Sequence, residues 1–362
     1  MTLLRNIPRS CLGRRRVLAT IPTLLLFVWL LVSVDQQLHP DSYLLPSTQL
    51  SAVALQAFSW LDLVSDNYFR PRSKVVSPLP GLLIAPSRLC RESSFMVAIV
   101  LSPPRDFQMR QLIRTTWGRA VRTRQWPGAS GPLPVSSEVF FVLGASNNPS
   151  EHRRVEAEAE EHDDLIVGDL LDSYPNLTLK TLTGLSWVSR RCALARFVMK
   201  VDQDTLVDFP RLTEFLLRHE PQLRNAVVGK LYYDSKRLTS GKWKVTTEEY
   251  PFSRYPTFAG GPCYLISMDA VPRMVNASRF LPFFRMEDVH VTGIVAQAVG
   301  VARLYMQQLR NWYSGESYCI FLERDKYQVS LTELSSDKLQ HVWRILTSGT
   351  CLPFHDKGKA AR

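Results

Sequence analysis

The sequence predicts an α/β fold with a mostly parallel central sheet, preceded by one transmembrane helix. Several short runs are continuously apolar and rich in β-branched side chains, at residues 95–101, 139–143, 165–167 and 197–201. Such runs are typical of strands that are buried on both faces of a parallel sheet. Helical patterns lie between them, at residues 109–117, 151–161 and 177–190. This alternation of strand and helix indicates the α/β class.

The N-terminus has the pattern of a membrane anchor. Residues 17–34 contain no charged side chain, and at about 1.5 Å per residue they are long enough to cross a bilayer. A cleaved signal peptide is the alternative, but its apolar part is usually about 7–15 residues long and ends at small residues. Here the run continues into the polar sequence DQQLHP. Arginines precede the span, which places residues 1–16 in the cytosol and the rest of the chain in the lumen, as a single-pass type II protein.

The formal net charge of +11 is explained in part by this N-terminus. Five arginines crowd the residues before the apolar run: Arg5, Arg9, Arg14, Arg15 and Arg16. The remaining excess of positive charge is diffuse, with no long basic run and no interleaved aromatic residues. Nucleic-acid binding is therefore not expected.

Residues 35–90 differ in composition from the C-terminal three quarters of the chain. Prolines interrupt every short apolar run in this stretch, at Pro40, Pro46, Pro71, Pro78, Pro80 and Pro86. This pattern predicts a stem with little fixed structure, apart from one helical piece near residues 51–64. The lumenal domain would then comprise residues 91–362.

The cysteines and sequons agree with a lumenal domain. Five cysteines follow the predicted span, at Cys90, Cys192, Cys263, Cys319 and Cys351. The lumen permits disulfides, and the odd number leaves at least one cysteine free or paired between chains. Asn176 and Asn276 each begin a glycosylation sequon, and Asn176 is the favoured site.

Several common site motifs are missing from the sequence. Neither GxGxxG nor GxxxxGK[ST] occurs, so the familiar phosphate-binding glycine loops are absent. The His and Cys residues show no metal-ligand spacing such as CxxC or HExxH. An acidic cluster at residues 156–164 is interpreted as a solvated helix face.

The segment that carries most chemical information is FVMKVDQD, residues 197–204. An apolar strand ends there in two carboxylates, Asp202 and Asp204. At the end of a strand both can reach the crevice in which open α/β sheets bind ligands. Paired carboxylates suit a hard divalent cation that also binds phosphate oxygens. A turn that uses aspartate is the alternative.

Three further segments have both a structural and a functional interpretation. Asp288 opens an apolar, helical stretch at residues 285–293, either as a favourable helix N-terminus or as a general base. Gly260 and Gly261 precede a proline and predict a tight turn, which could also let the backbone approach a ligand. Arg110 and Arg114 share a helix face and could reach a diphosphate; a solvated surface is the alternative.

Taken together, these segments resemble the β-1,3-glycosyltransferase family, glycosyltransferase family 31, which contains β-1,3-galactosyltransferases and β-1,3-N-acetylglucosaminyltransferases. The resemblance covers residues 90–351 and rests on five motifs in order: RQLIRTTWG, NLTLKTLTGLSWV, FVMKVDQDTLVDFPRL, YPTFAGGPCYLIS and MEDVHVTGIVA. It implies a type II Golgi membrane protein with a GT-A nucleotide-sugar transferase fold. It also implies a UDP-sugar donor, Mn²⁺ or Mg²⁺, inversion at the anomeric carbon, and a glycan acceptor on a glycoprotein or glycolipid.

By position, the resemblance implies a role for each site residue. Asp204 would bind the metal, and Asp202 would lie at the donor ribose or in the metal's outer shell. Asp288 would remove the proton from the acceptor hydroxyl. The remaining donor-binding candidates are Arg110, Arg114, Lys200, Gly260 and Gly261. Galactose is the first expectation for the donor sugar and N-acetylglucosamine the second.

The chain also departs from the family pattern. Gln203 stands in the middle of the acidic triplet, and Ala259 stands where the family often has a cysteine. Thr332 stands where the family commonly has a histidine. If that histidine holds the metal, this site needs another ligand, for which His290 and His341 are unranked candidates. A degenerate domain that binds glycans or nucleotides without catalysis is therefore the alternative function.

Overall fold

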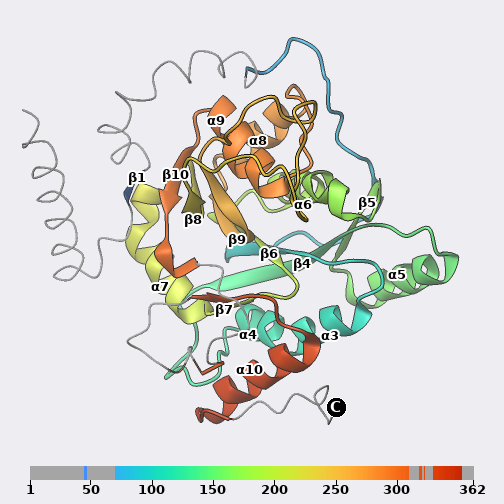
Figure 1. Ribbon diagram of the computed structural model, residues 1–362. Coiled ribbons are helices and arrows are strands. Elements are labelled where there is room, and N and C mark those ends of the chain that lie inside the picture. The colour runs from blue at the N-terminus through green and yellow to red at the C-terminus, as the bar shows by residue number, and fades with distance from the viewer. Residues whose placement is uncertain (1–44, 47–69, 310–317, 320–321, 323–328, 353–362) are drawn as a thin grey trace, which may run out of the picture. The chain divides into compact units, whose positions relative to one another are not determined.

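A computed structural model of the protein describes residues 45–46, 70–309, 318–319, 322 and 329–352 (Figure 1). The chain divides into two units, residues 1–45 and 46–362. Apart from β1 (Leu45–Pro46), at the boundary, the described helices and strands lie in the second unit. Within the described ranges no helix is long and apolar enough to cross a membrane. The predicted tail 1–16, the predicted span 17–34 and the predicted helical piece near 51–64 lie outside those ranges.

Strands and helices alternate along the second unit, as predicted. The strands are β2 (Leu82–Ile84), β3 (Ser94–Leu101), β4 (Ser136–Ala145), β5 (Leu165–Leu171), β6 (Phe197–Asp202), β7 (Leu206–Val207), β8 (Ala226–Tyr232), β9 (Phe258–Ser267), β10 (Ala302–Tyr305) and β11 (Ser330–Leu331). The α-helices are α3 (Phe107–Thr115), α4 (Trp117–Thr123), α5 (Pro149–His162), α6 (Leu177–Arg191), α7 (Phe209–His219), α8 (Val271–Ser278), α9 (Ala296–Ala298) and α10 (Ser336–Ser348). Short 3₁₀ turns are η1 (Tyr174–Asn176), η2 (Glu220–Leu223) and η4 (Gln307–Leu309), and η3 (Val289–Val295) is a π-helix.

The central sheet of this unit has the strand order β10-β8-β9-β6-β3-β4-β5-β2. Strands β9 and β2 run antiparallel to their neighbours, and the other strands are parallel to one another. The predicted α/β class with a mostly parallel sheet is confirmed. Because the carboxyl ends of β3, β4, β5 and β6 meet at one edge, that edge is where a ligand site is expected.

Helices cover both faces of the sheet, with α6 and α8 on one side and α3, α4 and α10 on the other (Figure 1). On the α6 side, Trp187 meets Phe140 with ring centroids 4.6 Å apart. On the α3 side, the guanidinium of Arg114 lies 4.8 Å from the ring centroid of Phe141. Adjacent residues of β4 therefore face opposite layers, as the pleat requires. Every residue of β3 is buried, which explains its uninterrupted apolar run.

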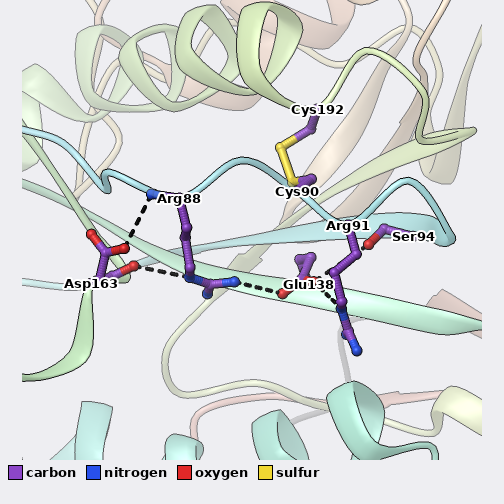
Figure 2. The surroundings of a disulfide bond; sticks show 7 residues. All are labelled: Arg88, Cys90, Arg91, Ser94, Glu138, Asp163 and Cys192. Carbon is purple, nitrogen blue, oxygen red and sulfur yellow. Dashed lines mark hydrogen bonds and ion pairs between the residues drawn. A yellow bond between two sulfur atoms is a disulfide. The ribbon is translucent and has the colours of Figure 1, made fainter.

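Residues 70–90, predicted as part of the stem, belong to the folded domain. Strand β2 pairs antiparallel with β5, and a disulfide joins Cys90 to Cys192 at the end of α6 (Figure 2). The prediction of little fixed structure is therefore wrong for this part of 35–90. A short edge strand tolerates flanking prolines, because its outer backbone groups need no partner within the sheet.

Figure 2 shows how ion pairs fix the same segment. The buried Glu138 carboxylate accepts from Arg88 at 3.0 Å and from Arg91 at 2.5 Å. Burial by itself would raise the pKa of Glu138, but its hydrogen bonds with the two arginines lower it below the ordinary value. The Asp163 carboxylate accepts from the backbone N–H of Arg88 at 3.1 Å. The segment before β3 is thus held by contacts with residues far along the chain.

The disulfides leave one cysteine free among the described residues. Cys319 pairs with Cys351, and Cys263 is free and buried in β9. Burial raises the pKa of the Cys263 thiol to about 12. The prediction that at least one of the five cysteines after residue 34 is unpaired within the chain is confirmed.

Candidate functional site

A pocket of about 580 Å³ opens at the carboxyl edge of the parallel strands. Its lining includes the last residues of four neighbouring strands: Leu101, Ala145, Leu171 and Asp202. Gln203 and Asp204 also line it. The acidic triplet predicted from the sequence therefore borders a pocket at the place where α/β sheets bind ligands.

The first two residues of the triplet have different partners. The Asp202 carboxylate accepts from Lys200 Nζ at 2.6 Å and remains partly exposed. The Gln203 side chain accepts from the Ser102 hydroxyl at 2.7 Å and donates to the Asp106 carboxylate at 2.5 Å. Gln203 thus ties β6 to the segment after β3, while Asp202 faces the pocket.

Asp204 lacks a partner of opposite charge of the kind that Lys200 provides for Asp202. Among the residues with described positions, no Lys, Arg or His forms an ion pair with its carboxylate. Burial, and then the neighbouring charge of Asp202, raise the pKa of Asp204 to about 6. A carboxylate whose pKa is raised by a second carboxylate beside it, at the mouth of a pocket, suits a divalent cation, which would stabilise both negative charges. The donor set therefore fits a hard cation that keeps part of its water shell.

Thr332, which stands where the family commonly has a histidine, lies at this site. The Thr205 hydroxyl donates to the Asp204 carboxylate at 3.4 Å and lies within hydrogen-bond distance, 3.0 Å, of the Thr332 hydroxyl. The described part of the chain contains no group of three His, Cys, Asp or Glu side chains that could hold a metal. His290 and His341 therefore do not complete a site with Asp202 and Asp204 in that part.

A buried cluster lies behind Asp202, in which sequence analysis named Lys200 and Gly261 as candidates but missed Glu287 and Tyr264. Lys200 Nζ donates to the Gly261 carbonyl at 2.5 Å and lies 3.5 Å from the Glu287 carboxylate. The Tyr264 hydroxyl donates to Glu287 at 2.5 Å. Burial alone would lower the pKa of Lys200, but Asp202 and Glu287 hold it above the ordinary value. Apart from the family resemblance, the sequence signal for Lys200 is a charged residue inside an apolar strand, which is unusual unless the charge is paired.

Asp288 is the N-cap of η3, where its carboxylate accepts from the Val289 N–H at 2.9 Å. Burial, followed by the adjacent charge of Glu287, raises the pKa of Asp288 to about 7. The predicted helix start is confirmed. A carboxylate with this pKa can both accept and release a proton near neutral pH, which is the property that a general base needs.

The predicted tight turn at Gly260 and Gly261 is wrong. Both residues lie inside β9, and neither has a positive φ angle. A Cβ added at Gly261 would lie 3.5 Å from the Asp288 carboxylate, so this glycine leaves room for the acid beside the strand. The backbone at Gly261 does approach other groups closely, but these are the side chains of Asp288 and Lys200. Both glycines have an extended backbone, so the strand continues through them.

Arg110 and Arg114 lie on α3, on the face of the sheet opposite to α6, and form a buried network of ion pairs. All five N–H groups of Arg110 donate to protein acceptors, among them both oxygens of Glu158 at 2.8 and 2.6 Å. Arg114 donates to both oxygens of Asp164 at 2.8 and 2.7 Å. The geometry gives both arginines a structural role and leaves Arg110 no donor for a diphosphate.

The same contacts correct part of the interpretation of residues 156–164 as a solvated helix face, in which Glu156, Glu160 and Glu161 are exposed as interpreted. Glu158 and Asp164 are buried, and they neutralise the two arginines. Burial alone would raise the pKa of Glu158, but Arg110 and then Arg114 lower it. A charge can be buried in this way because a partner of opposite sign is already in place.

A second lysine shapes the other rim of the pocket. The buried Lys180 donates to the Asp172 carboxylate at 2.8 Å and to the Ser102 carbonyl at 2.8 Å. Asp172 also accepts from the Gly144 N–H at 2.8 Å. The ends of β3, β4 and β5 are thus connected through one ion pair, and both charged residues line the pocket. Sequence analysis did not name either residue of this pair.

Comparisons with known proteins agree on one family. The sequence model described as Galactosyltransferase matches residues 108–307. The chain is 36% identical to β-1,3-galactosyltransferase 5 of Pan troglodytes over 237 residues, which are 64% of this chain and 76% of that one. It is 33% identical to the Homo sapiens protein of the same name over 270 residues, 72% of this chain and 83% of that one.

One further sequence relative matches a longer part of the chain, and one solved structure shows a weaker similarity. β-1,3-Galactosyltransferase 1 of Mus musculus is 28% identical over 302 residues, 80% of this chain and 87% of that one. A solved structure of the galactosyltransferase LgtC has a TM-score of 0.34 and 9% identity, and covers 71% of this chain and 98% of that one. That structural similarity is too low to assign the fold more finely than α/β.

Proposed function

Because the chain belongs to the Galactosyltransferase family of β-1,3-glycosyltransferases, we propose that it is an inverting β-1,3-hexosyltransferase with a GT-A fold. It moves a sugar from a UDP-sugar to a glycan acceptor on a glycoprotein or glycolipid. Galactose is the first expectation for the sugar, since β-1,3-galactosyltransferases 5 and 1 are among its relatives, and N-acetylglucosamine is the second.

The proposal rests mainly on the environment of the Asp288 carboxylate. Its carboxylate has a pKa of about 7 and lies beside Gly261. Asp288 accepts the proton from the acceptor hydroxyl as that oxygen attacks the anomeric carbon, and UDP leaves from the opposite face. The displacement inverts the anomeric centre in one step, so it needs no nucleophile from the protein.

The acidic triplet supports donor binding. Asp204 and Asp202 would hold Mn²⁺ or Mg²⁺ at the pocket, and the ion would stabilise charge on the departing diphosphate. Lys200 holds the Asp202 carboxylate in place through its 2.6 Å contact. The pocket of about 580 Å³ beside these carboxylates has the size of a small-molecule site and would receive the nucleotide.

A transfer assay against a panel of UDP-sugars, with and without manganese, tests the proposal. Wild-type protein should transfer one sugar in preference to the others. Asp288→Asn should lower the rate by about 10²-fold or more, the usual scale for a general base, with UDP-sugar binding nearly intact. Asp204→Ala should abolish metal-dependent UDP binding, measured by calorimetry. Undiminished transfer by Asp288→Asn would remove this residue from the base role.

A second candidate function is non-catalytic binding of glycans or nucleotides. The observation that favours it is the neutral Thr332–Thr205 contact beside Asp204, where a histidine ligand is expected from the family. A degenerate site of this kind would still bind UDP through the pocket. No transfer to a broad acceptor panel by wild-type protein that binds UDP would establish this alternative.

A further inference from the structure

The connection between β8 and β9, residues 233–257, is long but well anchored. Lys236 and Arg254 form an isolated antiparallel bridge. The Arg237 guanidinium donates to the Val245 carbonyl at 2.6 Å. Val245 and Tyr250 are fully buried and pack in the main hydrophobic core. The connection is thus a fixed part of the domain, and side chains at its tip are held in place.

Trp243 lies at the tip of this connection with its ring in solvent. The tip turns at Gly241, which has a φ of 79°, and the Lys244 N–H donates to the Gly241 carbonyl at 3.1 Å. Trp243 is 44% exposed. Its only polar side-chain atom, Nε1, donates to the Tyr174 hydroxyl at 2.9 Å. Lys242 Nζ lies 5.3 Å from the Tyr174 ring centroid and 5.5 Å from that of Trp243.

This group is connected both to the pocket and to the segment that carries Asp288. Tyr174 is itself 43% exposed and lines the pocket together with Asp202 and Asp204. Arg285, three residues before Asp288, donates to the Lys244 carbonyl and, at 2.6 Å, to Glu249. Trp243 thus contacts a residue of the pocket lining, and the residue after it contacts the segment before the proposed base.

We propose that Trp243 and Tyr174 form the surface on which the acceptor saccharide stacks, with Lys242 donating hydrogen bonds to its hydroxyl groups. The inference rests on the proposed function and names the acceptor side of the same site. A pyranose ring has a face of C–H groups, which carry partial positive charge. This face complements the negative face of an aromatic ring. The hydrogen bond from Nε1 fixes the indole in its plane, and Lys242 covers one face of the ring, which leaves the other face available.

An ordinary exposed side chain does not explain the arrangement. Single exposed apolar residues are common on protein surfaces, and Leu238 in the same connection is one, at 46% exposure. At Trp243, by contrast, two aromatic rings and an ammonium group meet, a hydrogen bond joins the two aromatic residues, and one of them, Tyr174, lines the pocket. Fixed aromatic side chains lose little conformational entropy when a ligand binds, and they are frequent anchors of recognition sites.

Steady-state kinetics of the full chain test the proposal. Trp243→Ala should raise the KM for the acceptor by about tenfold or more, the scale for losing a main anchor residue. The KM for the UDP-sugar and the rate of its hydrolysis by water should stay at wild-type values. Trp243→Phe, which keeps an aromatic face, should lie closer to wild type. Leu238→Ala is the matched control and should change none of these quantities.

Direct binding separates this proposal from the transferase proposal. An array of oligosaccharides ending in galactose, N-acetylglucosamine or N-acetylgalactosamine is probed with wild type, Trp243→Ala and Asp288→Asn. Binding that is lost only in Trp243→Ala supports the stacking surface, even if wild type transfers no sugar. An unchanged acceptor KM or unchanged array binding in folded Trp243→Ala overturns it. An equal rise in the KM for the UDP-sugar, or no saccharide binding by wild type, also overturns it.

Discussion

At the scale of single residues, the pKa of Asp288 predicts how activity depends on pH. The base must be ionised to accept a proton, and burial together with Glu287 raises its pKa to about 7. We expect kcat/KM to fall by about tenfold for each pH unit below that value. A pH–rate profile of the purified protein measures this acid limb. A profile that stays flat down to about pH 5 would contradict the assignment of Asp288 as the base.

A substitution at Glu287 tests whether its charge contributes to the raised pKa of Asp288. Glu287→Gln removes the neighbouring charge that raises the pKa of Asp288, so the acid limb should move to lower pH. Glu248→Gln is the control, because Glu248 is an exposed carboxylate that is absent from the causes of the Asp288 shift. It should leave the limb in place. Equal movement in both variants would mean that general surface charge sets the pKa.

At the scale of elements, α3 and α5 are joined by the pairing of Arg110 with Glu158. Arg110 has no exposed surface, and Glu158 binds its guanidinium through both oxygens. Glu158→Gln would leave a buried guanidinium without its charged partner. We expect the free energy of unfolding to fall by about 3–5 kcal/mol, the usual cost of breaking a buried pair from one side. Urea denaturation followed by fluorescence measures the change.

Glu156→Gln on the same helix is the control. Glu156 is half exposed and pairs with the exposed His152. Its loss should change stability by less than about 0.5 kcal/mol. If Arg110 instead served the donor's diphosphate, Glu158→Gln would weaken UDP binding in folded protein while its stability stayed at the wild-type value. That result would restore the sequence-based prediction for Arg110.

At the scale of the whole molecule, the uncharged run 17–34 predicts a type II protein of the Golgi membrane. Residues 1–16 would lie in the cytosol, and the folded domain in the lumen. In sealed microsomes, a C-terminal epitope should therefore resist protease until detergent is added. Digestion without detergent would disprove this topology, and a secreted, shortened product would support a cleaved signal peptide.

N-glycans provide a second readout of the same topology. Sequence analysis favours Asn176, but the Asn176 amide donates to the Leu171 carbonyl at 2.9 Å and is only partly exposed. Asn276 is exposed on α8. A glycosidase-sensitive mass shift should therefore persist in Asn176→Gln and be reduced in Asn276→Gln. No shift in the wild type would argue against a lumenal domain.

Local sequence patterns predicted the features that depend on neighbouring residues. The apolar runs became β3, β4, β5 and β6, because burial on both faces of a strand requires apolar residues at consecutive positions. The helical pattern at 177–190 became α6 almost without change. The start of η3 at Asp288 and the position of Asp202 at a strand end were also predictable, since capping and strand ends are local properties.

Only the tertiary structure decided the partners of the charged residues. Arg110 meets Glu158 across 48 residues, and Lys200 meets Gly261 across 61. No local pattern encodes such pairs, because they depend on which elements pack together. For the same reason, the sequence did not reveal that Gly260 and Gly261 lie in a strand beside Asp288 and not in a turn. The sequence by itself determined the class of fold, the family resemblance and the acidic residues at the pocket, while packing decided which charges support the structure and which remain available for chemistry.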